Sequence, residues 1–367
     1  MLNVRLIGAL VGVTLATTGC GAPAPAPLTP APPTLAPTVA PTSATAGDVM
    51  SRLYAEARTQ GAISMQAPTH VEDMQVLVDL FHKTYPDITI NYQSVESGNL
   101  VSNLRTQQSA QNVQIDLASV GMDRAATLQQ AGAMQTIDWP SLGVPPEDVV
   151  AGAYVKWYDF PHAVAYNKNN VSADEVPKTW DDLLKPRWSN GKIAHEATSS
   201  YAVAFQLDNA WGRDRAVGYA TELAKQQPIE EQRADLALQA IITGEADVAT
   251  VGIAALLLAQ QQGAPIDIAP VSPQMSLPFG FFIPAGAHHV AGAELFGLWF
   301  LTPEARAAFA QQAKYAPVLP CTASEIATYI CAHGIQLVAY QSFDQVGQTP
   351  DFVRAYQSAL GVIQGAP

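Results

Sequence analysis

The sequence predicts an α/β protein built from two lobes that share a hinge. Its 367 residues are enough for two domains, since a domain usually has about 100–200 residues. Short apolar runs alternate with amphipathic segments of helical period, which is typical of a parallel or mixed sheet covered by helices. The alternation occurs in two series, each expected to form one lobe, and a later segment is suited to return to the first lobe and complete it. Two passages of the chain between the same lobes predict a hinge.

The first series begins near residue 62. Residues 71–83 are predicted to form a helix because Val71, Met74, Leu77 and Phe81 fall on one face. The strands expected here are residues 62–65, 88–92 and 115–119, and the other helices are 99–108 and 124–131. The first lobe is therefore expected to comprise residues 48–155 and 268–300.

The second series follows residues 164–167 and is expected to form a lobe of residues 156–267. Its predicted strands are residues 192–195 and 246–251, and its predicted helices are 180–184, 200–210, 215–225 and 234–243. Residues 266–269 and 279–283 then return to the first lobe, and residues 301–367 form a C-terminal helical segment. Ligands of open α/β sheets bind outside the carboxyl ends of the strands, so the site is expected in a cleft at the hinge.

The N-terminal residues predict export. Arg5 precedes an apolar run over residues 6–16, which is too short to span a bilayer and is typical of a signal peptide. Small residues before Cys20 resemble the bacterial lipoprotein signal, although Leu15 stands five residues before the cysteine instead of three. We expect residues 1–20 to be a signal peptide and Cys20 to be lipidated; ordinary secretion is the alternative.

Residues 21–47 contain eight prolines and no charge, so they are expected to form an extended tether. In the remainder of the chain only Cys321 and Cys331 are cysteines, and in an exported protein they predict one disulfide. A metal site that includes His333 is the weaker alternative.

Composition excludes some functions. Charged residues make up 14% of the chain and the formal net charge is -13, and the 19 lysines and arginines are too few to predict nucleic-acid binding. No nucleophile elbow, phosphate-binding glycine loop or His-Glu-x-x-His motif occurs, so an enzyme is not expected. A surface sensor or adhesin with the same fold remains an alternative.

Several motifs together point to one family. Residues 177–188 (PKTWDDLLKPRW), 191–193 (GKI) and 165–168 (AYNK) resemble segments of bacterial extracellular solute-binding proteins of the ferric-ion-binding and related type. Further matches, Gly244-Glu245-Ala246-Asp247 among them, follow in family order as far as about residue 312. The resemblance implies the type II periplasmic-binding-protein fold, closure about the hinge and an ABC permease as partner.

The resemblance does not identify the solute. Ferric-ion members hold the metal with adjacent tyrosines soon after the Gly-Glu strand, and residues 250–256 here contain no tyrosine, histidine or carboxylate. The expected solute is small and carries a carboxylate, phosphonate or phosphate group, with ferric iron or an iron chelate as the alternative. No resident cofactor is expected.

Polar residues at four turns are the candidate ligand contacts. Helix starts bind anions through their free N–H groups, although Ser, Thr and Asn at such places also serve as helix caps. The candidates are Thr69, His70, Ser97, Gly98, Tyr158, Asp159, Thr198, Ser199 and Ser200.

The fourth of these turns is placed at residues 157–162, where Tyr158 and Asp159 are expected to line the cleft unless the segment is simply a packed hinge. Together with His70 and Glu72 they could form a rearranged metal site. His288-His289 is interpreted as a surface helix start without a metal role. We expect a monomeric lipoprotein at the outer face of the cytoplasmic membrane that serves an ABC importer.

Overall fold

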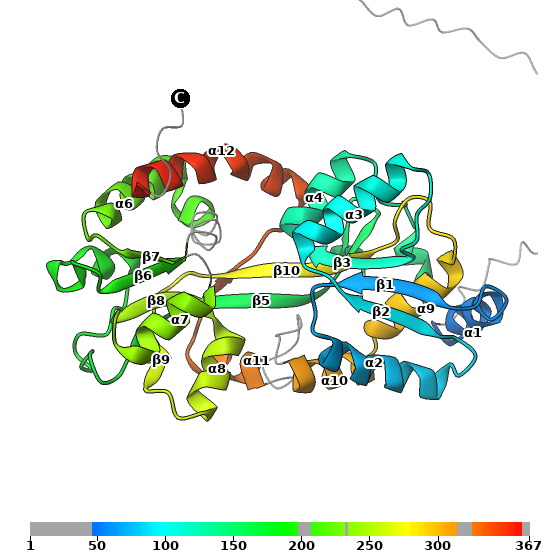
Figure 1. Cartoon of the computed structure of the whole chain (residues 1–367), viewed down its shortest axis with the longest axis horizontal. Coiled ribbons are helices and arrows are strands. Elements are labelled where there is room, and N and C mark those ends of the chain that lie inside the picture. Colours follow the sequence, from blue (N-terminus) through cyan, green and yellow to red (C-terminus); the bar gives the residue numbers. More distant parts are fainter. Residues whose placement is uncertain (1–45, 197–206, 232–233, 314–324, 362–367) are drawn as a thin grey trace, which may run out of the picture. The chain divides into compact units, whose positions relative to one another are not determined.

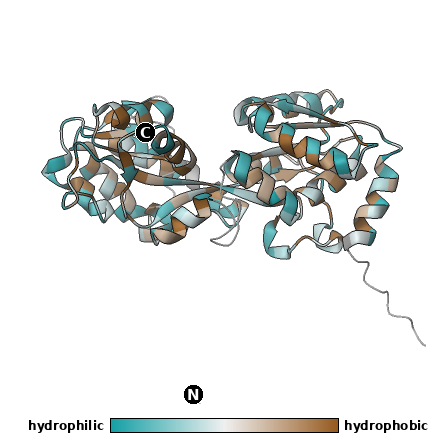
Figure 2. Cartoon of the chain, turned by 90° about the horizontal axis from the view of Figure 1, so that it is seen from below, coloured by the Kyte–Doolittle hydropathy of each residue, from teal (hydrophilic) through white to brown (hydrophobic). Residues whose placement is uncertain are grey.

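A computed structural model describes residues 46–196, 207–231, 234–313 and 325–361. All of them belong to one compact unit, Ala44–Pro367. The fold is mixed α/β, with strands that form one continuous path and helices on both sides (Figure 1). In Figure 2 hydrophobic and hydrophilic residues alternate along the helices, as expected for helices that bury one face.

The first lobe is built around three parallel strands. The sheet has the order β2-β1-β3-β10, with β10 antiparallel to β3. Of the apolar face predicted for residues 71–83, Met74, Leu77 and Phe81 are fully buried, whereas Val71 at the start of the helix is 48% exposed. The elements are β1 (Ile63–Ala67), α2 (Val71–Thr84), β2 (Ile90–Ser94), α3 (Ser97–Ser109), β3 (Leu117–Gly121) and α4 (Met122–Gln130).

A helix that we did not predict precedes these elements. α1 (Ala46–Ala57) begins where the tether was expected to end, and it packs against α9 (Val290–Phe300). Val49, Leu53 and Ala57 bury the contact, and their spacing is that of one helix face. Asp48, Arg52 and Glu56 are exposed, so the sequence here has the pattern of an amphipathic helix that the prediction missed.

The turn predicted at residues 157–162 is wrong. This segment lies inside β5 (Tyr154–Asn167), a strand of 14 residues, which pairs with β10 (Gln274–Phe282) in one half and with β8 (Val248–Gly252) in the other. Its aromatic and branched residues favour a strand, and Pro161 is the last residue paired with β10, after which the strand continues with β8 as its partner. The two lobes are therefore linked by an uninterrupted strand.

The second lobe continues the same sheet in the order β5-β8-β6-β7. β6 and β8 are parallel, while β5 runs antiparallel to β8 and β9. The elements are η3 (Trp180–Leu184), η4 (Pro186–Trp188), β6 (Ile193–Glu196), α6 (Arg213–Ala224), β7 (Ile229–Glu231), α7 (Ala234–Thr243), α8 (Ile253–Gln261) and β9 (Ile266–Ile268).

Short elements and C-terminal helices complete the unit. η1 (Trp139–Leu142), η2 (Pro146–Asp148) and β4 (Val149–Val150) lead into β5, and β11 (Leu337–Val338) pairs with β10. The helices that follow α9 are α10 (Pro303–Ala313), α11 (Glu325–Ala332) and α12 (Phe343–Leu360). Cys331 of α11 is disulfide-bonded, while its predicted partner Cys321 lies outside the described residues.

The buried apolar residues form separate cores for the two lobes. Two clusters fill the first lobe, around Phe81 and Phe296 and around Leu104 and Leu128. Two others fill the second lobe, around Trp188 and around Ile241 and Leu256. β5 contributes Trp157 to a first-lobe core and Val164 to a second-lobe core, so the middle of this strand lies between the cores.

Candidate functional site

One strand of each lobe ends in a glycine, and both glycines lie beside the middle of the strands that link the lobes, β5 and β10. Gly121 ends β3 and pairs with Phe279 of β10, and Gly252 ends β8 and pairs with His162 of β5. Each glycine is the N-cap of the next helix, α4 or α8, and neither helix start has a side-chain cap. The carboxyl ends of strands from both lobes therefore meet the same stretch of β5 and β10, as the fold class predicts.

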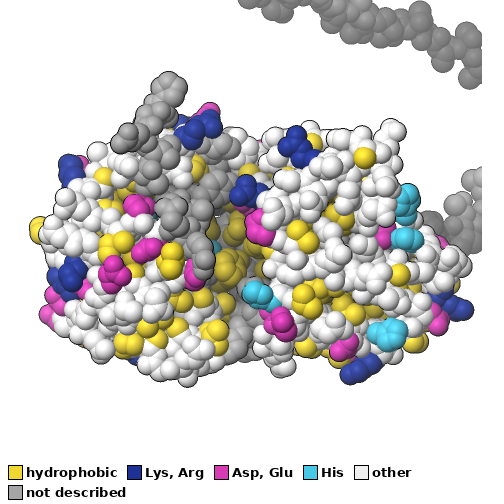
Figure 3. Space-filling view, in the orientation of Figure 1, with side chains coloured by type: hydrophobic (Ala, Val, Ile, Leu, Met, Phe, Trp, Pro, Cys, Tyr) yellow, Lys and Arg dark blue, Asp and Glu magenta, His cyan; other side chains and the backbone are white. Residues whose placement is uncertain are grey.

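An apolar surface lies between these two glycines. We call Phe160, Leu277 and Phe279 the apolar floor. Phe160 pairs with Leu277, so their side chains share one face of the strand pair, and each member of the floor is partly exposed. A Cβ atom on Gly121 would lie 3.2 Å from Leu277 Cδ2, and one on Gly252 would lie 3.2 Å from Phe160 Cζ. Figure 3 shows hydrophobic side chains in a hollow near the middle of this face of the molecule.

Buried polar atoms without hydrogen-bond partners occur around the same strand ends. Such atoms are uncommon in folded proteins and often mark functional sites. In the described residues they include Thr69 Oγ1, Asp123 Oδ1 and His162 Nδ1. Thr69 follows β1, Asp123 follows β3, and His162 lies on β5.

His162 is the most informative of these groups. His162 is 8% exposed, and burial lowers the pKa of its imidazole to about 4, an effect that a hydrogen bond with the Phe160 backbone partly offsets, so the imidazole is neutral at pH 7. The ring packs edge to face against Phe160, with 4.9 Å between the ring centroids. His162 pairs with Gly252, and because Gly252 has no side chain the Phe160 ring, on which His162 packs, lies against the start of α8.

Asp159 lies on the opposite face of β5 from Phe160, because neighbouring strand residues alternate. Burial raises its pKa to about 6, an effect that the Ser276 hydroxyl and Lys156 partly offset. In the described residues no ion pair includes Asp159. Asp123 differs, because its carboxylate lies 3.5 Å from Arg124 Nε. Burial raises the pKa of Asp123 as well. Asp159 was predicted to line the cleft as an acceptor for a cationic group, and in the structure it does not share a face with the floor.

The candidates of the first lobe have different environments. Thr69 is 1% exposed, and its carbonyl oxygen accepts a hydrogen bond of 2.6 Å from the Tyr92 hydroxyl. His70 is exposed and is the N-cap of α2, with no side-chain cap. Ser97 and Gly98 begin α3, but the Glu96 carboxylate already accepts from the Gly98 and Asn99 amides at 2.8 and 3.1 Å. The Gly98 amide is thus occupied by a cap and is not presented to an anion.

The placement of Tyr158 at the surface of the cleft is wrong. Tyr158 is 2% exposed and is stacked on Phe279, with 4.8 Å between the ring centroids. The register between β5 and β10 shifts beside Phe279, so Trp157 is an extra residue, and both it and Tyr158 face the first-lobe core. Sequence alternation could not reveal this bulge.

The rearranged metal set is not assembled either. Tyr158 is enclosed by aromatic rings, whereas His70 and Glu72 are exposed at the start of α2. Among the described residues no group of three or more His, Cys, Asp or Glu side chains is arranged to hold a metal ion. Thr198, Ser199, Ser200 and Cys20 lie outside the described residues.

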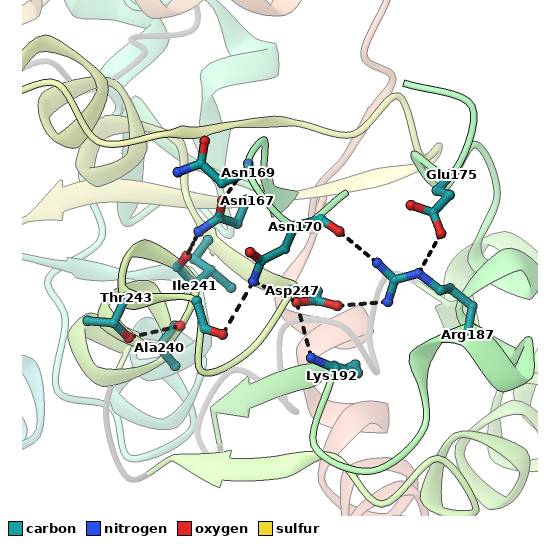
Figure 4. Close-up of polar contacts among 11 residues, drawn as sticks. Asn167, Asn169, Asn170, Glu175, Arg187, Lys192, Ala240, Ile241, Thr243 and Asp247 are labelled. Carbon is teal, nitrogen blue, oxygen red and sulfur yellow. Dashed lines mark hydrogen bonds and ion pairs between the residues drawn. The ribbon is translucent and has the colours of Figure 1, made fainter. Parts of the chain in front are cut away.

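The motifs that carried the family resemblance meet in a different place, the outer end of the second lobe (Figure 4). Asp247 is buried and accepts hydrogen bonds from Arg187 Nη1 at 2.7 Å and Asn170 Nδ2 at 2.9 Å. Arg187 also binds Glu175 at 2.8 Å, and Lys192 Nζ lies 3.6 Å from Asp247. These residues tie β6, β8 and η4 together, so their pattern reports the fold and not the solute.

His288-His289 is also structural. The backbone amides of both residues donate to Asp116 Oδ1, at 3.1 and 3.0 Å, and His289 Nδ1 lies 2.9 Å from Asp116 Oδ2. His289 is the N-cap of α9, so the pair begins a helix as predicted. Asp116 joins this helix start to β1 through the Ser64 amide.

Two α/β lobes linked by shared strands, with strand ends of both lobes around a partly exposed floor, define a type II periplasmic binding protein. The sequence matches the family of bacterial extracellular solute-binding proteins over residues 67–307, and the chain belongs to this family. Solute-binding proteins of this kind supply ABC importers. No curated protein matches the chain. None of the described helices combines the length and apolar character needed to cross a bilayer.

Solved structures of low sequence identity share the fold. Iron-bound HitA from Pseudomonas aeruginosa is 17% identical with a TM-score of 0.68, over 81% of this chain and 99% of that one. Trichodesmium IdiA (FutA) in complex with iron and citrate is 19% identical, with a TM-score of 0.69 over 82% and 99%. AfuA from Actinobacillus pleuropneumoniae with fructose 6-phosphate is 16% identical, with a TM-score of 0.62 over 83% and 100%.

Proposed function

We propose that this protein captures a small organic anion at the start of α8 and delivers it to the permease of an ABC importer. The anion is a carboxylate, phosphonate or phosphate, and the nonpolar part of the solute lies on the apolar floor. The observation that carries the proposal is the combination of a helix start without a side-chain cap and a nearby buried, neutral imidazole whose Nδ1 atom has no hydrogen-bond partner among the described residues.

The start of α8 differs from the other helix starts near the strand ends. α3 is capped by Glu96, α4 has Asp123 in its first turn, and α2 has Glu72 and Asp73 there. α8 has a glycine N-cap, no side-chain cap and no acidic residue in its first turn. The amides of Ile253 and Ala254 are therefore suited to an external anion, which the helix dipole also attracts.

His162 would complete this anion site. A neutral imidazole with hydrogen on Nδ1 donates one hydrogen bond, and an anionic oxygen is a strong acceptor. Because His162 is neutral down to about pH 4, it would recognise the anion through a hydrogen bond and not through charge. Thr198, Ser199 and Ser200 are proposed as further contacts, on the ground of the sequence alone.

Iron is the second candidate. Two of the solved structures of similar fold hold iron, one of them together with citrate. A ferric chelate fits the described residues better than a bare ion, because the chelate brings its own oxygen ligands and still presents carboxylates to a helix start.

We further propose that Cys20 anchors a monomeric protein to the outer face of the cytoplasmic membrane, and that the protein is not an enzyme. The apolar character of the floor supports a binding role. Turnover of a bound solute in a product assay would contradict it.

The first test is a thermal shift assay on residues 44–367 with matched probes. Phenylphosphonate and methylphosphonate share the anion and differ in the nonpolar part, and ferric citrate is compared with citrate alone. A probe at 100 times its dissociation constant adds about 2.7 kcal/mol of stability. Stabilisation by phenylphosphonate above methylphosphonate supports the floor, and equal stabilisation supports the anion alone. Stabilisation by ferric citrate only supports iron, and no response to any probe contradicts the anion assignment.

Ser199→Ala with Ser200→Ala tests the contacts predicted from sequence. Loss of a charge-assisted hydrogen bond should reduce affinity for the stabilising probe by about 1.5–3 kcal/mol, measured by calorimetry. An affinity within about twofold of the original would remove both serines from the site.

A further inference from the structure

Helix α12 contacts both lobes. Phe343 and Val346, at its beginning, belong to the first-lobe core that includes Leu128 of α4. Phe352 and Tyr356, nearer its end, belong to the second-lobe core that includes Leu223 of α6. Helix α12 packs against both α4 and α6, and Figure 1 shows it running from one to the other.

This arrangement makes α12 a link between the lobes in addition to β5 and β10. When two lobes rotate about their linking strands, the distance between the anchors on α4 and α6 must change. Val346 and Phe352 are six residues apart, so a regular helix holds them about 9 Å apart along its axis. A stiff α12 anchored in both cores would therefore oppose the rotation.

The sequence interrupts α12 between its two anchors. Gly347 and Pro350 lie between Val346 and Phe352. Pro350 has no amide hydrogen, so the Val346 carbonyl lacks its intrahelical hydrogen bond, and glycine further lowers helix stiffness. Prolines and glycines are the usual causes of helix bends. The least rigid part of the helix therefore lies between Val346, the last residue of the first-lobe anchor, and Phe352, the first residue of the second-lobe anchor.

We propose that α12 is a strap across the hinge, and that bending at 347–350 sets how far the lobes open. The strap would act on the balance between open and closed forms without touching the solute. The proposal stands apart from the identity of the solute, because it can be tested on the protein without any ligand.

The test measures the distance between the lobes by electron spin resonance. Spin labels are placed by Asn103→Cys on α3 and Thr221→Cys on α6, both exposed positions, in residues 44–367 with the native disulfide formed. Gly347→Ala and Pro350→Ala restore a regular helix. A methyl group fits at Gly347, since its Cβ would lie 3.7 Å from Gln130 Nε2, an ordinary contact. We expect a narrower distance distribution with a shifted mean.

Two further variants make the test decisive. Ser358→Ala raises helix propensity at an exposed position beyond the bend, and it should leave the distribution unchanged. Phe343→Ala with Val346→Ala loosens the first-lobe anchor, and it should broaden the distribution towards longer distances. Circular dichroism confirms that each variant is folded. If the folded double variant Gly347→Ala with Pro350→Ala leaves the distribution as it was, the strap is disproved.

Discussion

His162 lies directly opposite Gly252 across the β5 and β8 pair, and its Nδ1 atom is buried without a hydrogen-bond partner in the described part of the chain. An unpaired buried donor costs free energy, so such a group is expected where a ligand supplies the missing partner. The helix that starts at Gly252 has no side-chain cap among the described residues.

Replacing His162 separates binding from stability. His162→Phe keeps a flat ring against Phe160 but removes the donor, so affinity for the probe identified by thermal shift should fall by about tenfold or more. Stability of the free protein should be unchanged or higher, because a buried unpaired polar atom is lost. His195→Phe, a change at another buried histidine with a pKa lowered to about 4, is the control and should keep the affinity. Normal binding by His162→Phe would place the imidazole outside the site.

Asp159 should make stability depend on pH in a defined direction. Its folded-state pKa of about 6 is above the ordinary value of 3.8, so its favourable contribution is present below about pH 4 and is lost as the pH rises through about 6. Asp159→Asn should therefore stabilise the protein at pH 7.5 by up to about 3 kcal/mol and by much less at pH 4. Urea unfolding at both pH values measures this. Glu147→Gln at an exposed position is the control, and an equal gain at the two pH values would contradict the assignment.

The Arg187 and Asp247 pair should be important for stability. Asp247 is 2% exposed, so Arg187→Ala leaves a buried charge poorly compensated and should cost about 3–5 kcal/mol in urea unfolding. The double variant Arg187→Ala with Asp247→Asn should recover part of this loss. Lys185→Ala, which breaks an exposed pair with Asp182, should cost less than about 1 kcal/mol. Similar losses for Arg187→Ala and Lys185→Ala would mean that burial of Asp247 has little effect.

Glu96 should act as a helix cap and not as a ligand contact. Glu96→Ala removes two hydrogen bonds to the start of α3 and should destabilise the protein by about 1 kcal/mol, measured as a lower unfolding midpoint. Affinity for the stabilising probe should change little. A loss of affinity larger than the loss of stability would return the start of α3 to the site.

Part of the site could be predicted and part could not. The strand ends that carry Thr69 and Gly98 were located correctly, because short apolar runs followed by helical periods are visible in any single sequence. The role of Gly98 was not predicted, because its amide is occupied by the Glu96 carboxylate, and this side-chain geometry cannot be seen in the sequence. His162 was noticed only as part of an aromatic turn. The signal that could have identified it was the strand register, which places it opposite the glycine that begins α8.

The sequence by itself determined the class of the protein: two alternating series of strands and helices, and motifs in family order whose residues form the Asp247 network. Local periodicity is enough for the alternating series, because secondary structure depends strongly on residues close together in the chain, and the resemblance of the motifs to the family supplies the class. Only the tertiary structure decided which groups are buried, paired or free at the hinge. The bulge that buries Tyr158, the unpaired imidazole of His162 and the two anchors of α12 each join segments far apart in sequence, and no local pattern specifies such contacts.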